Sequence, residues 1–407
     1  MRFPSETRPA GHETARAKRV GAGRVPNVLS RGPRSRIIPP VTVKRFEIVE
    51  MIAKGGMAEV YRARRVGVQG FEKEICIKKI LPHLTEDETF VTMFIDEAKL
   101  AATLSSANVV QVHDLCVSGN GEYFIVMEYV DGKDLADIIR TLQLEDRDVP
   151  PELAVHIARE ICQGLAYAHT KKGFDGRPLQ LVHRDISPHN VLVSRLGEVK
   201  LVDFGIAKAS SSMTVTEVGV LKGKYGYMSP EQARGRPLDH RTDLFNTGIV
   251  LYELLVGERC FAGASEFSTL DLMRNAEVVP PTRLNPEVPA SLERLVLWAL
   301  ALDPADRPQS ALELEQALGA WARAEGAVAA KGDLATFMRG LMGSASIPPV
   351  PTGPAVIEVE SVVRRAKPRP STVPVPSLMQ QPITPEPGPA GAEPSLEPMV
   401  VPRAASA

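Results

Sequence analysis

One stretch of this sequence decides its fold: Leu181-Val182-His183-Arg184-Asp185-Ile186-Ser187-Pro188-His189-Asn190-Val191-Leu192-Val193. An apolar run enters the stretch, a polar turn with Asp185 and Asn190 follows, and a second apolar run leaves it. Thirteen residues beyond Asn190, after a predicted hairpin around Leu196-Gly197, comes Asp203-Phe204-Gly205. The pattern predicts a loop between strands that presents polar side chains beside a second polar turn.

The oxygen atoms of these turns suit a divalent cation. Asn190 offers an amide oxygen and Asp203 a carboxylate, and Mg²⁺ binds few protein oxygens while it keeps waters and substrate phosphates. Asp185 then remains to orient a hydroxyl group and accept its proton. Asp185, Asn190 and Asp203 together are therefore a candidate set for Mg²⁺ binding and proton transfer, and their individual roles stay open at this point.

The elements around this loop fall into two groups. Strand-like runs and one helix precede residue 130, whereas the pattern beyond it is helical, and the helix at 151–169 has Pro151 at its favoured first position. We expect an α+β fold, with a small β-rich lobe followed by a larger α-helical lobe and a cleft between them. The expected strands are 46–52, 60–66, 74–80, 109–117 and 123–127, and the expected helices are 89–105, 151–169, 242–256 and 289–302.

A glycine-containing segment joins the first two predicted strands. A hairpin with glycine lets backbone N–H groups close over phosphate oxygens with no Cβ in the way. An ordinary Gly-Gly hairpin explains the same residues, so the segment alone does not decide between them. The candidate phosphate-binding residues are Ile52, Ala53, Lys54, Gly55, Gly56, Met57, Ala58, Glu59 and Val60.

Two charged residues are predicted among apolar neighbours. Strand alternation places Lys78 on the face of Cys76 and Ile80, and helical spacing places Glu97 on an apolar face. An unpaired buried charge costs roughly several kcal/mol, which favours a Lys78–Glu97 ion pair. The alternative is that Lys78 extends to solvent and Glu97 lies at the rim of a cleft.

Composition excludes several classes of protein. The 407 residues have a formal net charge of −1 and an apolar fraction of 44%, which gives no sign of nucleic-acid or membrane binding. The four cysteines are far apart, so we expect neither a disulfide framework nor a zinc site. No apolar run reaches the ~20 residues of a membrane span, and we expect a cytoplasmic protein.

Both ends of the chain have biased composition. Residues 1–44 hold ten Lys/Arg against two acids and are predicted to be a disordered basic arm. Residues 344–407 hold 15 of the 34 prolines and are predicted to be a disordered or polyproline-like tail. A solvated arm and an inert tail are the simpler interpretations. Contact with an anionic partner and docking on an aromatic groove are the alternatives.

The motifs together resemble the Hanks-type protein kinases, especially the bacterial serine/threonine kinases. The resemblance covers about residues 46–319 and implies a two-lobed protein kinase fold that uses ATP and Mg²⁺ and acts on protein substrates. It implies a β-rich lobe of about 46–127 and a helical lobe of about 131–319. We also expect a short helical extension at 320–343. Oligomeric state is left open.

The resemblance also assigns roles to individual residues. Lys78 would hold the α- and β-phosphates and pair with Glu97, Asp185 would be the catalytic base, and Asn190 and Asp203 would bind magnesium. Ser229-Pro230-Glu231 would take the place of the family's Ala-Pro-Glu motif. Further expected contacts are Met127 behind adenine, the hinge from Glu128 to Val130 along it, Asp134 at the ribose, Glu231 with Arg307, and Asp243 under the catalytic loop.

The sequence departs from the family in four places. Ala53 and Ala58 replace glycines of the phosphate loop, which predicts a different phosphate cover without loss of binding. Ser187 stands where the family has a lysine, and Lys224 stands where serine/threonine members usually have threonine. We expect Lys224 to supply the missing positive charge and count it among the catalytic residues. The alternative is a solvent-facing Lys224.

A cluster of hydroxyl residues lies between Asp203 and Glu231. Because Arg184 precedes the catalytic aspartate, the resemblance implies activation by a phosphate on this segment. Thr214 and Thr216 are the predicted sites of autophosphorylation, and an unmodified polar loop is the alternative. The competing functions are a pseudokinase that binds nucleotide without transfer and a kinase of small molecules.

Overall fold

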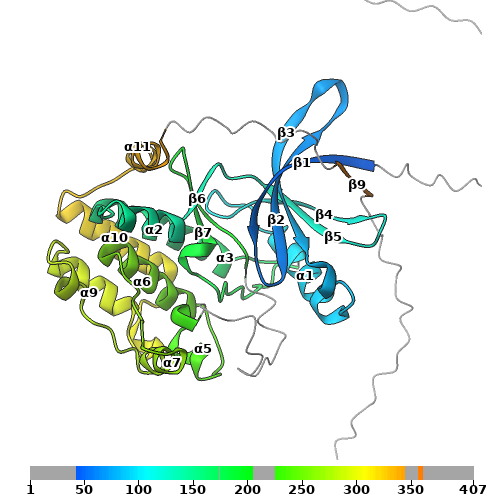
Figure 1. The fold of residues 1–407 in the computed structure, drawn as a ribbon. Coiled ribbons are helices and arrows are strands. Elements are labelled where there is room, and N and C mark those ends of the chain that lie inside the picture. The colour runs from blue at the N-terminus through cyan, green and yellow to red at the C-terminus, as the bar shows by residue number, and fades with distance from the viewer. Residues whose placement is uncertain (1–42, 174, 205–224, 344–355, 361–407) are drawn as a thin grey trace, which may run out of the picture. The chain divides into compact units, whose positions relative to one another are not determined.

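A computed structural model describes residues 43–173, 175–204, 225–343 and 356–360. Its N-terminal part is the predicted β-rich lobe, an antiparallel sheet with one helix (Figure 1). The helix, α1, begins after Asp87, whose carboxylate accepts a hydrogen bond from the Thr89 N–H. The elements of this lobe are β1 (Val43–Lys54), β2 (Ala58–Val66), β3 (Glu72–Ile80), α1 (Glu88–Ala101), β4 (Val112–Ser118) and β5 (Tyr123–Glu128).

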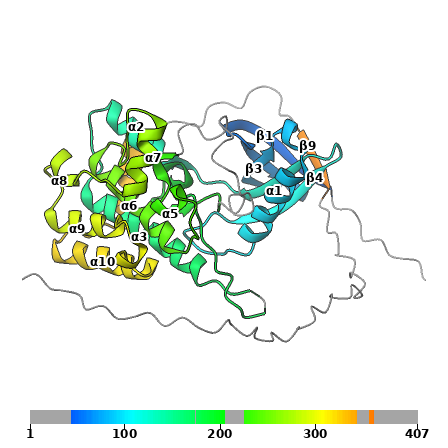
Figure 2. The same ribbon diagram turned by 90° about the horizontal axis from the view of Figure 1, so that it is seen from below.

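The two faces of this sheet bury different side chains because successive strand residues point to opposite sides. Cys76, Ile80 and Met127 pack with Phe94 and Ala98 of α1, so this face carries the helix. Figure 2 shows α1 against the strands. The other face has its own apolar cluster, which contains Phe46, Ala63, Ile75, Ile77, Cys116, Phe124 and Val126.

The second part of the chain is mainly helical, as predicted. Its centre is α6, which is buried along almost its whole length and packs on α3 and α9. The elements are β6 (Gly132–Asp134), α2 (Leu135–Leu144), α3 (Pro151–His169), β7 (Val191–Ser194), β8 (Val199–Leu201), α5 (Pro230–Ala233), α6 (Arg241–Val256), α7 (Glu266–Asn275), α8 (Pro281–Leu284), α9 (Ala290–Ala299), α10 (Ala311–Ala324) and α11 (Lys331–Met342).

The small sheet β6–β7–β8 supports the loop quoted at the start. Its strands pair antiparallel, and β6 lies so close to β7 that a Cβ at Gly132 would be 2.0 Å from the Val193 carbonyl oxygen. Helix α11 contacts β7, and Lys331 forms a 2.8 Å ion pair with Glu198. The 3₁₀ turn Pro188–Asn190 leads directly into β7 of this sheet.

Besides the short β6, one further strand lies where no strand was predicted. Val356–Glu360 form β9, which pairs antiparallel with both β1 and β4 and closes the sheet in the order β1-β2-β3-β5-β4-β9. The expectation that residues 344–407 lack regular structure is therefore wrong for these five residues. Their alternating Val-Ile-Glu-Val-Glu sequence contains no proline, so it can form a ladder that the flanking proline-rich sequence cannot.

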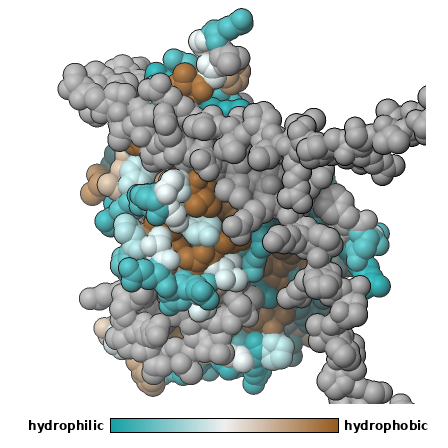
Figure 3. All heavy atoms as spheres, turned by 90° about the vertical axis from the view of Figure 1, so that its right-hand side faces the viewer, coloured by the Kyte–Doolittle hydropathy of each residue, from teal (hydrophilic) through white to brown (hydrophobic). Residues whose placement is uncertain are grey.

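Among the residues described, no helix is both long and apolar enough to cross a membrane. On the side of the molecule in Figure 3, hydrophilic side chains surround smaller hydrophobic patches.

Candidate active site

Lys78 lies between two carboxylates. Its Nζ is 2.8 Å from Glu97 Oε1 on α1 and 2.8 Å from Asp203 Oδ1 after β8. The structure thus brings together Lys78 and Glu97, which the burial of both charges predicted, and adds Asp203. Burial opposes the charge on Lys78, but Asp203 and Glu97 outweigh it and hold the Lys78 pKa above its usual range.

Glu97 is the more deeply shielded of the two carboxylates. Burial raises the pKa of Glu97 although the Lys78 ammonium works in the opposite direction. The Asp203 side chain keeps 43% of its surface exposed, whereas Glu97 keeps 15%. Asp203 is therefore the carboxylate that remains open to a ligand.

The turn with Asp185 is held by Asp243 from beneath. The Asp243 carboxylate accepts hydrogen bonds from the backbone N–H groups of His183 and Arg184, each at 2.8 Å, and has no exposed surface. Asp243 also lies 2.8 Å from His169 Nε2. Asp243 thus fixes the loop backbone, as expected, and His169 is a positioning residue that the sequence analysis missed.

Asn190 is oriented by its own loop. Its side-chain N–H donates to the Asp185 carbonyl oxygen at 2.7 Å, and its backbone carbonyl accepts from Val202 N–H at 3.0 Å. The second bond ties the Asp185 turn to the segment before Asp203. Since the Asn190 side-chain nitrogen donates to the Asp185 carbonyl, the carboxamide oxygen of Asn190 is the atom that suits a cation. Ser187, which lies between Asp185 and Asn190 in the sequence, is buried, with 4% of its surface exposed.

The β1–β2 hairpin carries the candidate phosphate loop. Gly55 N–H donates to the Ala58 carbonyl at 2.8 Å, and Lys54 pairs with Glu59 at 2.9 Å. Neither Ala53 nor Ala58 is among the described residues with positive φ, so both alanines occupy a backbone conformation that any residue adopts. The alanines at these two glycine positions therefore need no left-handed backbone.

The predicted adenine and ribose contacts lie on neighbouring elements. Met127 is buried on the same face as Cys76 and lines a cavity of about 30 Å³ together with Glu97, Asp203 and Phe204. Glu128 pairs with Lys200 at 2.7 Å and Val130 follows after β5. Asp134 caps α2 by accepting from Asp137 N–H at 2.7 Å, so one of its carboxylate oxygens has a structural role.

A family model described as protein kinase domain matches residues 46–318 of the chain. The chain belongs to the protein kinase family. It is 40% identical to "Tyrosine-protein kinase MasK" of Myxococcus xanthus over 73% of this chain and 46% of that protein. It is 38% identical to "Serine/threonine-protein kinase PrkC" of Bacillus subtilis over 67% of this chain and 39% of that protein.

Further relatives agree with this family. "Serine/threonine-protein kinase PknB" of Mycobacterium leprae is 36% identical over 68% of this chain and 43% of that protein. The chain thus spans less than half the length of these curated relatives. Among solved structures, a point mutant of the Mycobacterium tuberculosis PknI kinase domain matches with a TM-score of 0.51 and 26% identity, over 69% of this chain and 97% of that one.

Within this kinase fold, the Ser-Pro-Glu motif is joined to the loop that contains Asp185. Arg307 binds Glu231 through two bonds of 2.8 and 2.9 Å, and both side chains are buried. The neighbouring Gln232 donates its side-chain N–H to the Arg184 carbonyl at 2.9 Å. Gln232 was missed because 48 residues separate it from Arg184, and no local pattern reports such a contact.

Several predicted residues lie outside the described part of the kinase domain. Lys224, Thr214, Thr216 and Gly205 all fall in the segment 205–224. The prediction for Lys224 and the predicted autophosphorylation sites therefore stay predictions.

Proposed function

We propose that this chain is a serine/threonine protein kinase that transfers the γ-phosphoryl group of Mg-ATP to a protein hydroxyl group. The observation that carries the proposal is the pair of 2.8 Å contacts from Lys78 to Glu97 and Asp203. These contacts bring strand β3, helix α1 and the segment after β8 to one place. A protein kinase requires this Lys–Glu pair and the metal-binding aspartate in position at the same time.

The remaining residues divide the chemistry between them. Lys78 holds the α- and β-phosphates of ATP, and Asp185 orients the acceptor hydroxyl and takes its proton. The donor set of Asp203 and Asn190 fits magnesium, because both offer hard oxygen atoms and Asp203 is partly exposed. Bound Mg²⁺ would neutralise charge on the β- and γ-phosphate oxygens.

Adenosine recognition falls to the hinge and its surroundings in this proposal. Met127 stands behind the adenine, the backbone from Glu128 to Val130 runs along it, and Asp134 approaches the ribose. The β1–β2 hairpin from Ile52 to Val60 covers the phosphates, with Ala53 and Ala58 in unstrained conformations. Protein substrates are part of the proposal, and the Glu231–Arg307 pair supports the segment that would receive them.

Autophosphorylation between Asp203 and Glu231 also belongs to the proposal. The buried Arg184 Nε has no hydrogen-bond partner among the residues that the structure describes. A buried guanidinium nitrogen without a partner is costly, and a phosphate on Thr214 or Thr216 would supply one. Intact-mass spectrometry tests this step, and an active enzyme without phosphate would contradict it.

The relatives named above include both a tyrosine kinase and serine/threonine kinases, so the type of hydroxyl group that accepts phosphate is the first point to test. Purified chain is incubated with Mg-ATP and peptide pools that contain serine, threonine or tyrosine as the acceptor, and an Asp203→Asn chain serves as control. We expect labelled phosphoserine and phosphothreonine, and none with the control. Label on tyrosine alone would place the chain with MasK-like tyrosine kinases, and binding of ATP without any label would indicate a pseudokinase.

A further inference from the structure

A second pocket lies on the other face of the β-rich lobe, away from Lys78. It has a volume of about 160 Å³, and its floor is formed by Phe46, Ile75 and Val126, each with 3% or less of its surface exposed. Ile75 and Lys78 are three positions apart on β3 and therefore point to opposite faces of the sheet. The pocket is thus separate from the candidate active site.

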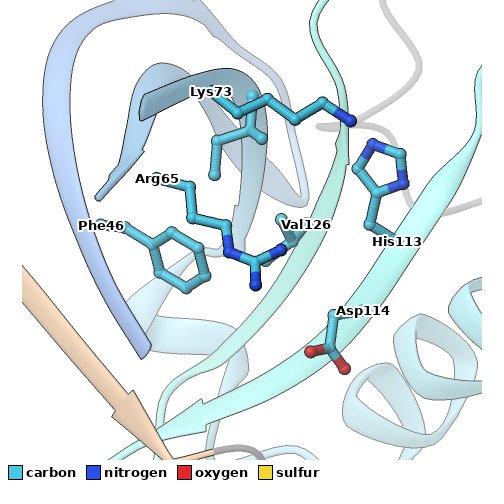
Figure 4. A pocket seen from close by; sticks show the side chains of 7 residues that line it. Phe46, Arg65, Lys73, His113, Asp114 and Val126 are labelled. Carbon is cyan, nitrogen blue, oxygen red and sulfur yellow. The ribbon is translucent and has the colours of Figure 1, made fainter. Parts of the chain in front are cut away.

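Cationic side chains line this pocket above its apolar floor (Figure 4). Arg65 of β2 and Lys73 of β3 stand directly opposite each other in the strand register. Like charges in directly opposed positions destabilise a sheet. Figure 4 shows the Arg65 guanidinium between Phe46 and Val126, and Lys73 extended toward His113.

Other cations of the same hairpin have acidic partners. Arg62 pairs with Glu50 and Glu74, and Arg64 pairs with Glu72. Among the side chains that the structure describes, no carboxylate forms an ion pair with Arg65 or Lys73. Among the described cationic side chains of β1 to β3, the lack of an acidic partner is therefore particular to the two that face the pocket.

His113 completes the rim from a bulge in β4. The register passes from Val112↔Met127 to Asp114↔Val126, so His113 is the extra residue of the bulged strand. Bulges re-aim side chains, and here the imidazole ring joins the lining of the pocket. Burial first, and then Lys73 and Arg65, lower the pKa of His113, against Glu128, which raises it.

The lining contains one carboxylate, that of Asp114. One of its oxygens accepts a 3.0 Å hydrogen bond from the Leu115 N–H. Two permanent cations and an imidazole therefore face one acid.

We propose that this pocket binds a phosphate monoester, with the phosphate between Arg65, Lys73 and His113 and an apolar body over Phe46.

The chemistry of the lining favours this ligand over other anions. Arg presents a planar fork that binds phosphate oxygens in a bidentate manner, and Lys adds a point charge. The apolar floor favours an ester with a carbon substituent over inorganic phosphate. The site is independent of phosphoryl transfer by this chain, because none of its residues takes part in the proposed reaction.

Calorimetric titration with phenyl phosphate tests the site. The full chain is first treated with phosphatase and then saturated with magnesium and a non-hydrolysable ATP analogue, so that the nucleotide site is filled. We expect saturable binding of one equivalent of phenyl phosphate and no binding of phenol. Absence of saturable binding in the millimolar range would overturn the proposal.

Matched variants locate the binding. Arg65→Gln and Lys73→Gln should each weaken the affinity about tenfold, as expected when one charge-assisted contact is lost. Arg64→Gln, one residue away on the opposite face, should leave it within about twofold. Peptide phosphorylation should not change in any of the three. The thermal unfolding midpoint should not fall in Arg65→Gln or Lys73→Gln, because each removes a contact between like charges. Equal affinity in Arg65→Gln and Arg64→Gln would refute the assignment.

A phosphopeptide distinguishes the two possible sources of the phosphate. The peptide spans residues 210–220 of this chain and carries phosphate on the threonine at position 214. Tighter binding of the peptide than of phenyl phosphate, lost in Arg65→Gln, would assign the pocket to phosphorylated protein segments. Equal or weaker binding would assign it to small phosphorylated molecules.

Discussion

At the scale of single residues, Lys78 is the central residue of the proposed ATP site. Its ammonium is nearly buried but has a carboxylate on two sides, so its positive charge is stabilised where ATP phosphates would bind. An ion pair that is largely removed from water holds its partners in place more than it stabilises the fold. We therefore expect changes at its partners to alter catalysis before they alter stability.

Replacement of Glu97 tests this positioning role. Glu97→Gln should lower kcat/KM for ATP by about 10²-fold. In this variant only Asp203 would hold the Lys78 ammonium by an ion pair, and a small displacement of a group that positions the substrate has an effect of this order. Asp96→Asn is the matched control, since Asp96 is the preceding residue of α1 and forms an exposed pair with Lys99. Steady-state kinetics with both variants would contradict the role if the two behaved alike.

Lys224 has its own test at this scale. If it replaces the family lysine at the position of Ser187, Lys224→Met should lower kcat on the order of 10²-fold or more, as with the loss of one transition-state donor. Lys222→Met, two residues earlier, should have little effect. Near-normal turnover of Lys224→Met would refute the exchange.

At the scale of elements, buried contacts fix the loop of Asp185 and the turn at Asp203. Arg184 and Asp203 adopt positive φ angles of 66° and 55°, which are uncommon for residues with a side chain. The Asp243 carboxylate on α6 accepts a hydrogen bond from the Arg184 N–H, and Lys78 on β3 forms an ion pair with Asp203. Strain of this kind persists only where the surroundings determine the conformation, and here helix and strand both do.

Removal of one partner of the Glu231–Arg307 pair should destabilise the helical lobe. Arg307→Met should cost roughly 3–5 kcal/mol of unfolding free energy, because it leaves Glu231 charged and buried. Urea unfolding measures this loss, with Arg241→Met, which removes a more exposed pair, as control. A loss no larger than that of the control would contradict the prediction.

The same pair gives a pH dependence with a definite sign. Burial would raise the pKa of Glu231, but Arg307 outweighs it and holds the pKa below the usual range. The stabilisation by Glu231 is therefore complete above the ordinary carboxylate pKa and is lost as pH falls through the lowered value. In Arg307→Met burial is no longer outweighed, so urea unfolding at a series of pH values should show this loss on acidification abolished or reversed in sign.

Strand β9 should stabilise the β-rich lobe. Val359 stands opposite Lys44 of β1 and Ser118 of β4, and proline there cannot donate to a ladder. Val359→Pro should lower the thermal midpoint by roughly 2–4 °C, which corresponds to a loss of ~1 kcal/mol. Val362→Pro, three residues further on, is the control, and equal midpoints in both would show that β9 adds no stability.

At the scale of the whole molecule, local patterns predicted most of the fold. Periodicity predicted the five long strands and α1 of the β-rich lobe, and α3, α6 and α9 of the helical lobe, but not α2, α7 or α10. The proximity of Lys78 and Glu97 followed from the cost of burying either charge alone. The contacts of His169 with Asp243 and of Gln232 with Arg184 depend on how distant segments pack, and no local spacing reports them. Strand β9 was missed because its five residues lie within proline-rich sequence.

Comparison of Asp185→Asn with the wild-type chain tests the central claim most directly. Calorimetry measures the affinity for Mg-ATP, and peptide phosphorylation measures turnover. We expect the affinity to stay within about threefold and kcat to fall by roughly 10²–10⁴-fold, because only the proton acceptor is lost. Turnover of Asp185→Asn at the wild-type rate would contradict the assignment of the chemistry to this loop.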